Sequence, residues 1–198
     1  MSEANNYVSE VGIAIYPHLN KPDVRFNENG EYKVNLEIPE AKAKVMINAI
    51  EKAIEKSISE AEAEVKGKKV KVAPKPYSVE NGKAIFKFKM KATGINRKTK
   101  ENFSQRPLIF DAKKNPIEPS SCQIWGGTKM KVAFQMGGYY TGLIGAGVSL
   151  RLKAVQILEL VEGKQTSMFK EEDGYTNNST QETANVETTQ VQEGADFW

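Results

Sequence analysis

The chain has 198 residues, with 28 basic and 25 acidic side chains and a formal net charge of +3 at pH 7. This length suits one domain of ordinary size, and a single cysteine cannot form an internal disulfide. No apolar run approaches the roughly 20 residues of a membrane-spanning helix, and the first residues lack a basic start with an apolar run, so we expect a soluble protein of a reducing cytoplasm.

The charges are unevenly divided along the chain. Residues 171–198 hold seven acidic residues and no Lys or Arg, which leaves 18 acidic against 28 basic residues in residues 1–170, a net charge of +10. A basic body predicts a polyanionic ligand. We therefore expect a folded domain over residues 1–170 and a disordered acidic tail over residues 171–198, because the tail has too few apolar residues to fold.

Two strands are predicted near the N-terminus. Residues 7–16 place Val11, Ile13 and Ile15 on one side, and we expect Pro17 to end this strand. An Asn-Glu-Asn-Gly turn at residues 27–30 leads into residues 32–38, where apolar and polar side chains alternate. The pair predicts part of an antiparallel sheet with one solvent-exposed face.

One amphipathic helix follows. Pro39 and Glu40 mark its start, since proline suits the first turn and an acid suits the positive end of the helix dipole. Apolar residues then recur at spacings of three and four: Ile47, Ile50, Ile54, Ile58, Ala61 and Val65. This stripe predicts a structural helix packed on a sheet.

Residues 66–100 contain twelve basic residues and a single acid, Glu80. Within them, a strand is predicted in which Phe86, Phe88 and Met90 share one face, while Lys87, Lys89 and Lys91 share the other. A row of like charges on one strand face repels itself unless an anion lies across it. The pattern therefore favours a bound polyanion, with a solvated charged face as the alternative.

Three more strands are predicted, at residues 106–111, 128–135 and 148–161. In the second of them, apolar residues alternate with Lys129 and Lys131. The glycine-rich residues 137–142 predict a tight connection before the last strand. Several short strands around one helix favour a mainly β protein built as a small barrel.

The sequence offers little for catalysis. His18 is the only histidine and Cys122 the only cysteine, and no nucleophile motif surrounds either. Asp23 and Asp111, the only aspartates before the tail, lack the clustering that metal-dependent nucleases need. We expect neither an enzyme nor a bound metal or cofactor.

Binding of a single nucleic-acid strand requires cations for phosphates and exposed aromatic faces for bases. The predicted phosphate-binding residues are Lys87, Lys89, Lys91, Arg97, Lys98, Lys100, Arg106, Lys129, Lys131, Arg151 and Lys153. The predicted stacking residues, each beside a turn or a basic residue, are Tyr77, Phe103, Trp125, Tyr139 and Tyr140. Ordinary core or rim positions are the alternative for each aromatic ring.

The acidic tail ends in Asp196, Phe197 and Trp198. Two large aromatic side chains beside carboxylates predict a docking motif for a basic partner protein, with a solubilising tether as the alternative.

Several short motifs, in their order, resemble those of bacteriophage single-stranded DNA-binding proteins, particularly of short-tailed phages. They are Lys21-Pro22-Asp23 with Phe26, Gly30-Glu31-Tyr32-Lys33-Val34 before the helix, residues 106–111, residues 124–128, the strand at 148–160 and the acidic tail with its aromatic end. The resemblance covers most of residues 1–170. It implies an OB-fold barrel with an inserted amphipathic helix.

The resemblance also implies a function: coating unwound single-stranded DNA in phage DNA replication, recombination and repair, in the cytoplasm of the infected bacterial host cell. The acidic tail would contact the phage DNA polymerase and helicase/primase. The alternatives are an RNA-binding or strand-annealing factor on the same fold and a structural phage protein. The oligomeric state stays open, a homodimer included.

Overall fold

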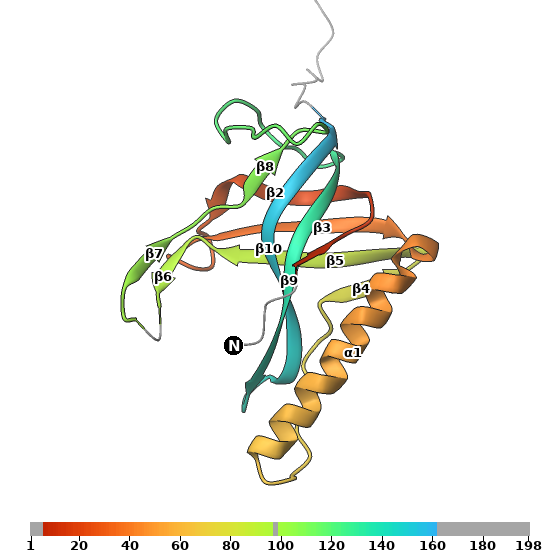
Figure 1. Ribbon diagram of the computed structural model, residues 1–198, viewed down its shortest axis with the longest axis vertical. Helices are drawn as coiled ribbons and strands as arrows, with labels where there is room; N and C mark the ends of the chain where they lie inside the picture. Colours follow the sequence, from red (N-terminus) through yellow and green to blue (C-terminus); the bar gives the residue numbers. More distant parts are fainter. Residues whose placement is uncertain (1–5, 97–98, 162–198) are drawn as a thin grey trace, which may run out of the picture. The chain divides into compact units, whose positions relative to one another are not determined.

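The computed structural model describes residues 6–96 and 99–161 (Figure 1). Its elements are β1 (Asn6–Val8), β2 (Gly12–Asp23), β3 (Glu31–Pro39), α1 (Glu40–Glu64), β4 (Tyr77–Glu80), β5 (Lys83–Lys91), β6 (Thr93–Ile95), β7 (Asn102–Ser104), β8 (Leu108–Phe110), β9 (Lys129–Thr141) and β10 (Gly145–Glu159). This confirms a mainly β fold with one inserted helix. The predicted acidic tail lies outside the described residues.

Five strands close into a ring. β2 pairs with β3, β3 with β5, β5 with β10, β10 with β9, and β9 again with β2. Within this ring only the β5–β10 pair is parallel, with Leu150 opposite Phe88. A five-stranded Greek-key ring is the OB-type barrel, here extended by β1, β4 and β8 into a larger sheet.

The core fills this ring because apolar residues alternate along its strands. Phe86, Phe88 and Phe134 are fully buried, and the ring centroids of Phe88 and Phe134 are 5.0 Å apart. The predicted alternation in β5 and β9 is confirmed, since Met130 and Val132 are buried as well. Burial of one face directs the intervening lysines outward.

Helix α1 packs against β9 and β10 (Figure 1). Pro39 occupies its N-cap position, and its buried residues are Ala43, Ile50, Ile54, Ser57 and Ala61. Three residues of the predicted stripe are thus buried, Ile47 and Ile58 are partly buried against the core, and Val65 is the C-cap beyond the last helical residue. The Ser57 hydroxyl donates a 3.0 Å hydrogen bond to the carbonyl oxygen of Gly147. A side chain at Gly138 would also meet this hydroxyl, at 3.2 Å, so glycines let the helix approach the sheet closely.

No helix in residues 6–96 and 99–161 is long and apolar enough to cross a membrane.

Two predictions for β2 are wrong. The strand continues past Pro17 to Asp23, because Pro17 falls in a register irregularity between Ile15 and His18, where no ladder hydrogen bond from its nitrogen is required. The core-facing side chain is Ala14, whereas Ile13 on the predicted side is exposed. Small residues are needed on the inner side of β2 at its start, since Leu36 and Ile38 lie directly against Gly12, whereas Leu19 is fully buried further along the strand.

The predicted connection at residues 137–142 is also misplaced. Residues 137–141 belong to β9, and the strand reverses only after Thr141. Gly137 and Gly138 serve packing, because a side chain at Gly137 would overlap the guanidinium group of Arg151.

Candidate nucleic-acid interface

The outer faces of β3, β5 and β10 carry a row of cations across the sheet. Lys89 on β5 has Lys33 as its register partner on β3 and Arg151 as its partner on β10. Neighbouring strands lie about 5 Å apart, so the backbone positions from which these three side chains start are close together. A further lysine, Lys91, lies opposite Glu31. The strand pairing thus concentrates positive charge on one face.

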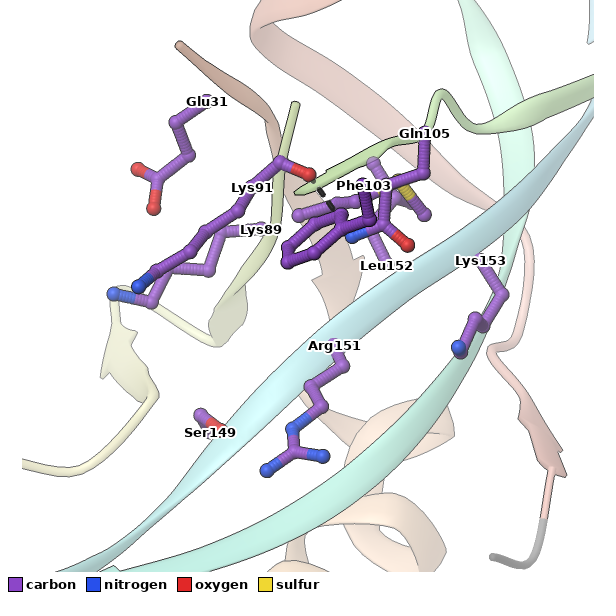
Figure 2. Close-up of a pocket in the computed structure, with 10 residues that line it drawn as sticks. Glu31, Lys89, Lys91, Phe103, Gln105, Ser149, Arg151, Leu152 and Lys153 are labelled. Atoms are coloured by element: carbon purple, nitrogen blue, oxygen red, sulfur yellow. Dashed lines mark hydrogen bonds between the residues drawn. The ribbon is translucent and has the colours of Figure 1, made fainter. Parts of the chain in front are cut away.

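A hollow of about 440 Å³ opens beside this row and is called the basic groove below. Its walls include Lys89 and Lys91 from β5, Arg151 and Lys153 from β10, and Phe103 from β7. Figure 2 shows the two lysines of β5 extending in the same direction, with the Phe103 ring beside them and the two β10 side chains across the groove. These five were all predicted as binding residues from sequence.

The β6–β7 hairpin holds Phe103 in place. Its ring packs on the backbone of Gly94 across the hairpin, where a Cβ would lie 3.0 Å from the ring. Gln105 fastens the hairpin to β5, because its side-chain amide donates a 2.9 Å hydrogen bond to the Lys91 carbonyl (Figure 2). The ring is half-buried and keeps one part exposed to the groove.

The cations of the basic groove form no ion pairs with described residues, although Glu31, opposite Lys91, also lines the groove. Among the described residues, none of Lys89, Lys91, Arg151 and Lys153 forms an ion pair. Two other predicted cations differ: Lys129 pairs with Glu159 at 2.7 Å and Arg106 with Glu118 at 3.6 Å. Unpaired cations on one face are available to an anionic ligand.

The structure places the remaining predicted cations away from the groove lining. Lys87 lies on the outer face of β5 opposite Asn35, and Lys100 is exposed in the β6–β7 connection. Lys131 lies opposite Gln156 on β10. It is four residues along β9 from Gln135, the register partner of Arg151, and four residues of a strand span roughly 13 Å. Arg97 and Lys98 lie outside the described residues. A DNA contact at each of these positions stays a prediction.

The predicted stacking residues are also dispersed. Tyr139 and Tyr140 lie near the end of β9, and the Tyr139 ring covers Gly147. Trp125 lines a separate hollow. Stacking by these residues stays a prediction.

Tyr77 has a packing role in this structure. Its ring lies 5.7 Å from that of Phe86, and its hydroxyl donates a hydrogen bond to Glu51 of α1. Burial and the Glu51 carboxylate raise the pKa of the Tyr77 hydroxyl. Because Lys75 also pairs with Glu51, at 2.8 Å, this group fastens the helix to β4. The geometry gives the stacking prediction for Tyr77 no support.

Sequence reasoning missed a buried carboxylate that organises two cations. Asp23 accepts hydrogen bonds from Nε and Nη2 of Arg25, both at 2.9 Å, and forms a 2.7 Å ion pair with Lys33. The hydrogen bonds from Arg25 and Lys33 hold the pKa of Asp23 well below its usual range. One feature of the sequence indicates this contact. The turn predicted at residues 27–30 folds β3 back on β2, and this pairing brings Lys33 to Asp23.

Metal binding has no support in the described part of the chain, residues 6–96 and 99–161. No group of three or more His, Cys, Asp or Glu side chains is arranged there to hold an ion.

An OB-type ring with unpaired cations and an aromatic ring on its outer face defines a nucleic-acid-binding class of protein. The family model described as "Single-stranded DNA-binding protein, Bacteriophage T7" matches residues 11–160. The chain belongs to this family of phage single-stranded DNA-binding proteins, as the sequence motifs predicted. The family is one of binding proteins rather than enzymes, which agrees with the absence of catalytic motifs.

Individual relatives give the same result. The chain is 31% identical over 176 residues to the single-stranded DNA-binding protein of Escherichia phage T7, covering 78% of this chain and 75% of that protein. It is 30% identical, with the same coverage, to the single-stranded DNA-binding protein of Enterobacteria phage T3.

Solved structures agree on the fold. The crystal structure of gp2.5, the single-stranded DNA-binding protein encoded by bacteriophage T7, matches with a TM-score of 0.73 and 29% identity over 87% of this chain and 98% of that one. The bacteriophage Enc34 single-stranded DNA-binding protein, solved in complex with single-stranded DNA, shares the fold with a TM-score of 0.57 and 18% identity, over 79% of this chain and 88% of that one.

Proposed function

We propose that this chain binds single-stranded DNA across the outer face of β3, β5 and β10. The observation that carries the proposal is the basic groove, where four cations that form no ion pair within the described part of the chain line the same hollow as the half-buried ring of Phe103. Phosphates bind to Lys89, Lys91, Arg151 and Lys153, and one base stacks on Phe103. Phosphate contacts carry no sequence information and a ring stacks on any base, so binding is largely independent of sequence.

The biological role that follows is coating of unwound DNA during phage DNA replication, recombination and repair, in the cytoplasm of the infected bacterium. Membership of the phage family supports this role. The acidic tail recruits the phage DNA polymerase and helicase/primase through Asp196, Phe197 and Trp198. Its composition supports this, because seven acids beside two aromatic residues suit a basic surface on a partner.

The test is a titration of fluorescent oligothymidine with the full chain at several salt concentrations, with duplex DNA and single-stranded RNA as competitors. We expect preference for single-stranded DNA and a log–log salt slope of about 0.7 per phosphate neutralised. Replacement of Lys89, Lys91 and Lys153 by Ala reduces that slope by about 2, because three phosphate contacts are removed.

A matched control removes the same charge elsewhere. Lys42, Lys44 and Lys52 are exposed on α1 and have no ion pair among the described residues, so their replacement by Ala leaves the slope nearly unchanged. Equal losses in both triple variants would show that net charge alone attracts the DNA. Equal binding of duplex and single strand would contradict the proposed function itself.

A further inference from the structure

A second hollow, of about 710 Å³, lies against β2 and β3 and is called the Tyr16 hollow below. Two aromatic side chains line it with much of their surface in solvent: Tyr16 is 78% exposed and Trp125 is 48% exposed. Among the described residues, neither ring contacts another aromatic ring. Both rings therefore offer exposed aromatic surface to a ligand in this hollow.

The backbone at Tyr16, which carries the more exposed of the two rings, is strained. Its φ is 48°, in the left-handed region that bulky residues rarely adopt. The strained residue falls within the register irregularity of β2 between Ile15 and His18. Strain of this kind persists only where the surroundings enforce it, and it is concentrated at binding and catalytic sites.

Hydrogen bonds fix the opposite wall to β2. Gly127 donates to the carbonyl of Ala14, and Ala14 donates to that of Thr128, both at 2.9 Å. The side chain of Asn20 donates to the carbonyls of Pro119 and Cys122, at 2.7 and 2.6 Å, and accepts from the amide of Ile124 at 3.0 Å. The segment that carries Trp125 is thus held in place before any ligand arrives.

The hollow also holds an anion-binding pair. Arg25 and Lys33 both line it, and both are fixed by Asp23, so two cations face one carboxylate. The side chain of Asp23 is only 4% exposed, which leaves the outward surfaces of the two cations for a ligand. They also lie 5.8 and 5.9 Å from the centroid of the Phe26 ring, which is 88% exposed.

We propose that the Tyr16 hollow binds a further nucleotide of the same DNA strand, with its base stacked on Trp125 and Tyr16 and its phosphate on Arg25 and Lys33. Lys33 connects the two sites, because it lies directly opposite Lys89 of the basic groove. The strand runs from Arg151 over Lys89 to Lys33, two strand spacings or about 10 Å, and then into the hollow. This inference rests on the proposed function and extends its site to residues of β2 and of the segment before β9.

The test uses the full chain with Trp198→Phe, which leaves Trp125 as the only tryptophan. We expect oligothymidine to quench its fluorescence. Tyr16→Asn removes the ring but keeps a residue that tolerates positive φ, and it weakens affinity about 5-fold or more, the cost of one lost stacking contact. Tyr16→Phe keeps the ring and retains the affinity.

Two further measurements separate this inference from the proposed function. Leu143→Ala, at a side chain that is 86% exposed in the turn after β9, serves as the control and leaves binding unchanged. Oligonucleotides carrying 5-iododeoxyuridine are photo-crosslinked, and mass spectrometry identifies the attached residues; we expect Tyr16 and Trp125 among them.

The subsite is wrong if Tyr16→Asn binds as tightly as the parent and no crosslink reaches either ring, while the Lys89, Lys91 and Lys153 triple variant still weakens binding. Failure of the parent chain to prefer single-stranded DNA would overturn the proposed function and this inference together. Thermal melting of each variant shows whether a loss of affinity is a loss of fold.

Discussion

The ammonium group of Lys33 lies 2.7 Å from Oδ2 of Asp23, and the same lysine is the register partner of Lys89. Asp23, which Lys33 shares with Arg25, therefore offsets part of the positive charge of one member of the cation row on the outer sheet face. Three like charges on adjacent strands repel one another. With Lys33 held by a carboxylate, Lys89 and Arg151 can stay without acidic partners when no DNA is bound.

Replacement of Asp23 by Asn should lower the melting temperature in a pH-dependent way. Hydrogen bonds from Arg25 and Lys33 depress the pKa of this carboxyl in the folded state, so it stabilises the fold at pH values above the ordinary carboxyl pKa. That contribution declines as the pH falls below about 4, because the carboxyl then takes up a proton in the unfolded chain while it stays ionised in the folded one. The difference between the melting temperatures of the two proteins should be full at about pH 5 and should shrink steadily as the pH falls from about 4 toward about 2. A constant difference would contradict the assignment.

Gly137→Ala should weaken DNA binding without unfolding the protein. Its Cβ would lie 2.5 Å from Nε of Arg151, and only the far end of that flexible side chain needs to move. The displaced guanidinium leaves the basic groove, so the salt slope should fall by about 0.7, one phosphate contact. Anisotropy titrations measure the slope. If Arg151→Ala lowers the slope and Gly137→Ala does not, the proposed displacement is wrong.

Gly145→Ala should destabilise the fold strongly. Its φ is +107°, and a Cβ there would lie 2.1 Å from the carbonyl oxygen of Lys71. Backbone strain and this contact together should cost at least about 2 kcal/mol of unfolding free energy. Gly142→Ala, where nothing lies within 4 Å and φ is not positive, is the control and should be neutral. Urea denaturation of the two variants measures the difference, and equal midpoints would contradict the prediction.

Deletion of residues 171–198 should tighten DNA binding at low salt. The seven acids removed compete with DNA for the same cations, and tethering gives them an effective concentration of roughly millimolar order. Because salt screens this competition, the DNA affinities of the two proteins should converge as the salt concentration rises.

The same deletion should abolish association with the phage polymerase, and so should the double variant Phe197→Ala with Trp198→Ala. Unchanged low-salt affinity after deletion, with retained polymerase binding, would contradict both roles of the tail.

Local patterns predicted the elements well where burial is one-sided. The helix begins after Pro39, and Phe86 and Phe88 face the core as their alternation indicated. The pattern failed in β2, where Ala14 faces the core in place of larger neighbours. At the start of β2, the size of an inward-facing side chain is limited by Leu36 and Ile38. These two residues belong to β3, so the local pattern of β2 does not show the limit.

The site was predictable only in part, because it is assembled across strands. Alternation identified Lys89 and Lys91, yet nothing local shows that β10 runs parallel to β5 and brings Arg151 opposite Lys89. Tyr77 is predicted to stack on bases because it lies beside a turn or a basic residue, yet in the structure its hydroxyl donates a hydrogen bond to Glu51, 26 residues away in sequence. Pairings over such distances depend on the whole fold.

The parallel pairing of β5 with β10 also has a kinetic consequence. These strands meet only after the chain up to about residue 151 has been made, since Arg151 lies opposite Lys89. Contacts between such distant segments form late, because loop closure costs entropy before the pairing stabilises the fold. During synthesis the basic groove therefore does not exist until the last strand has joined the ring, and a nascent chain that stops before β10 has no assembled surface with which to capture DNA.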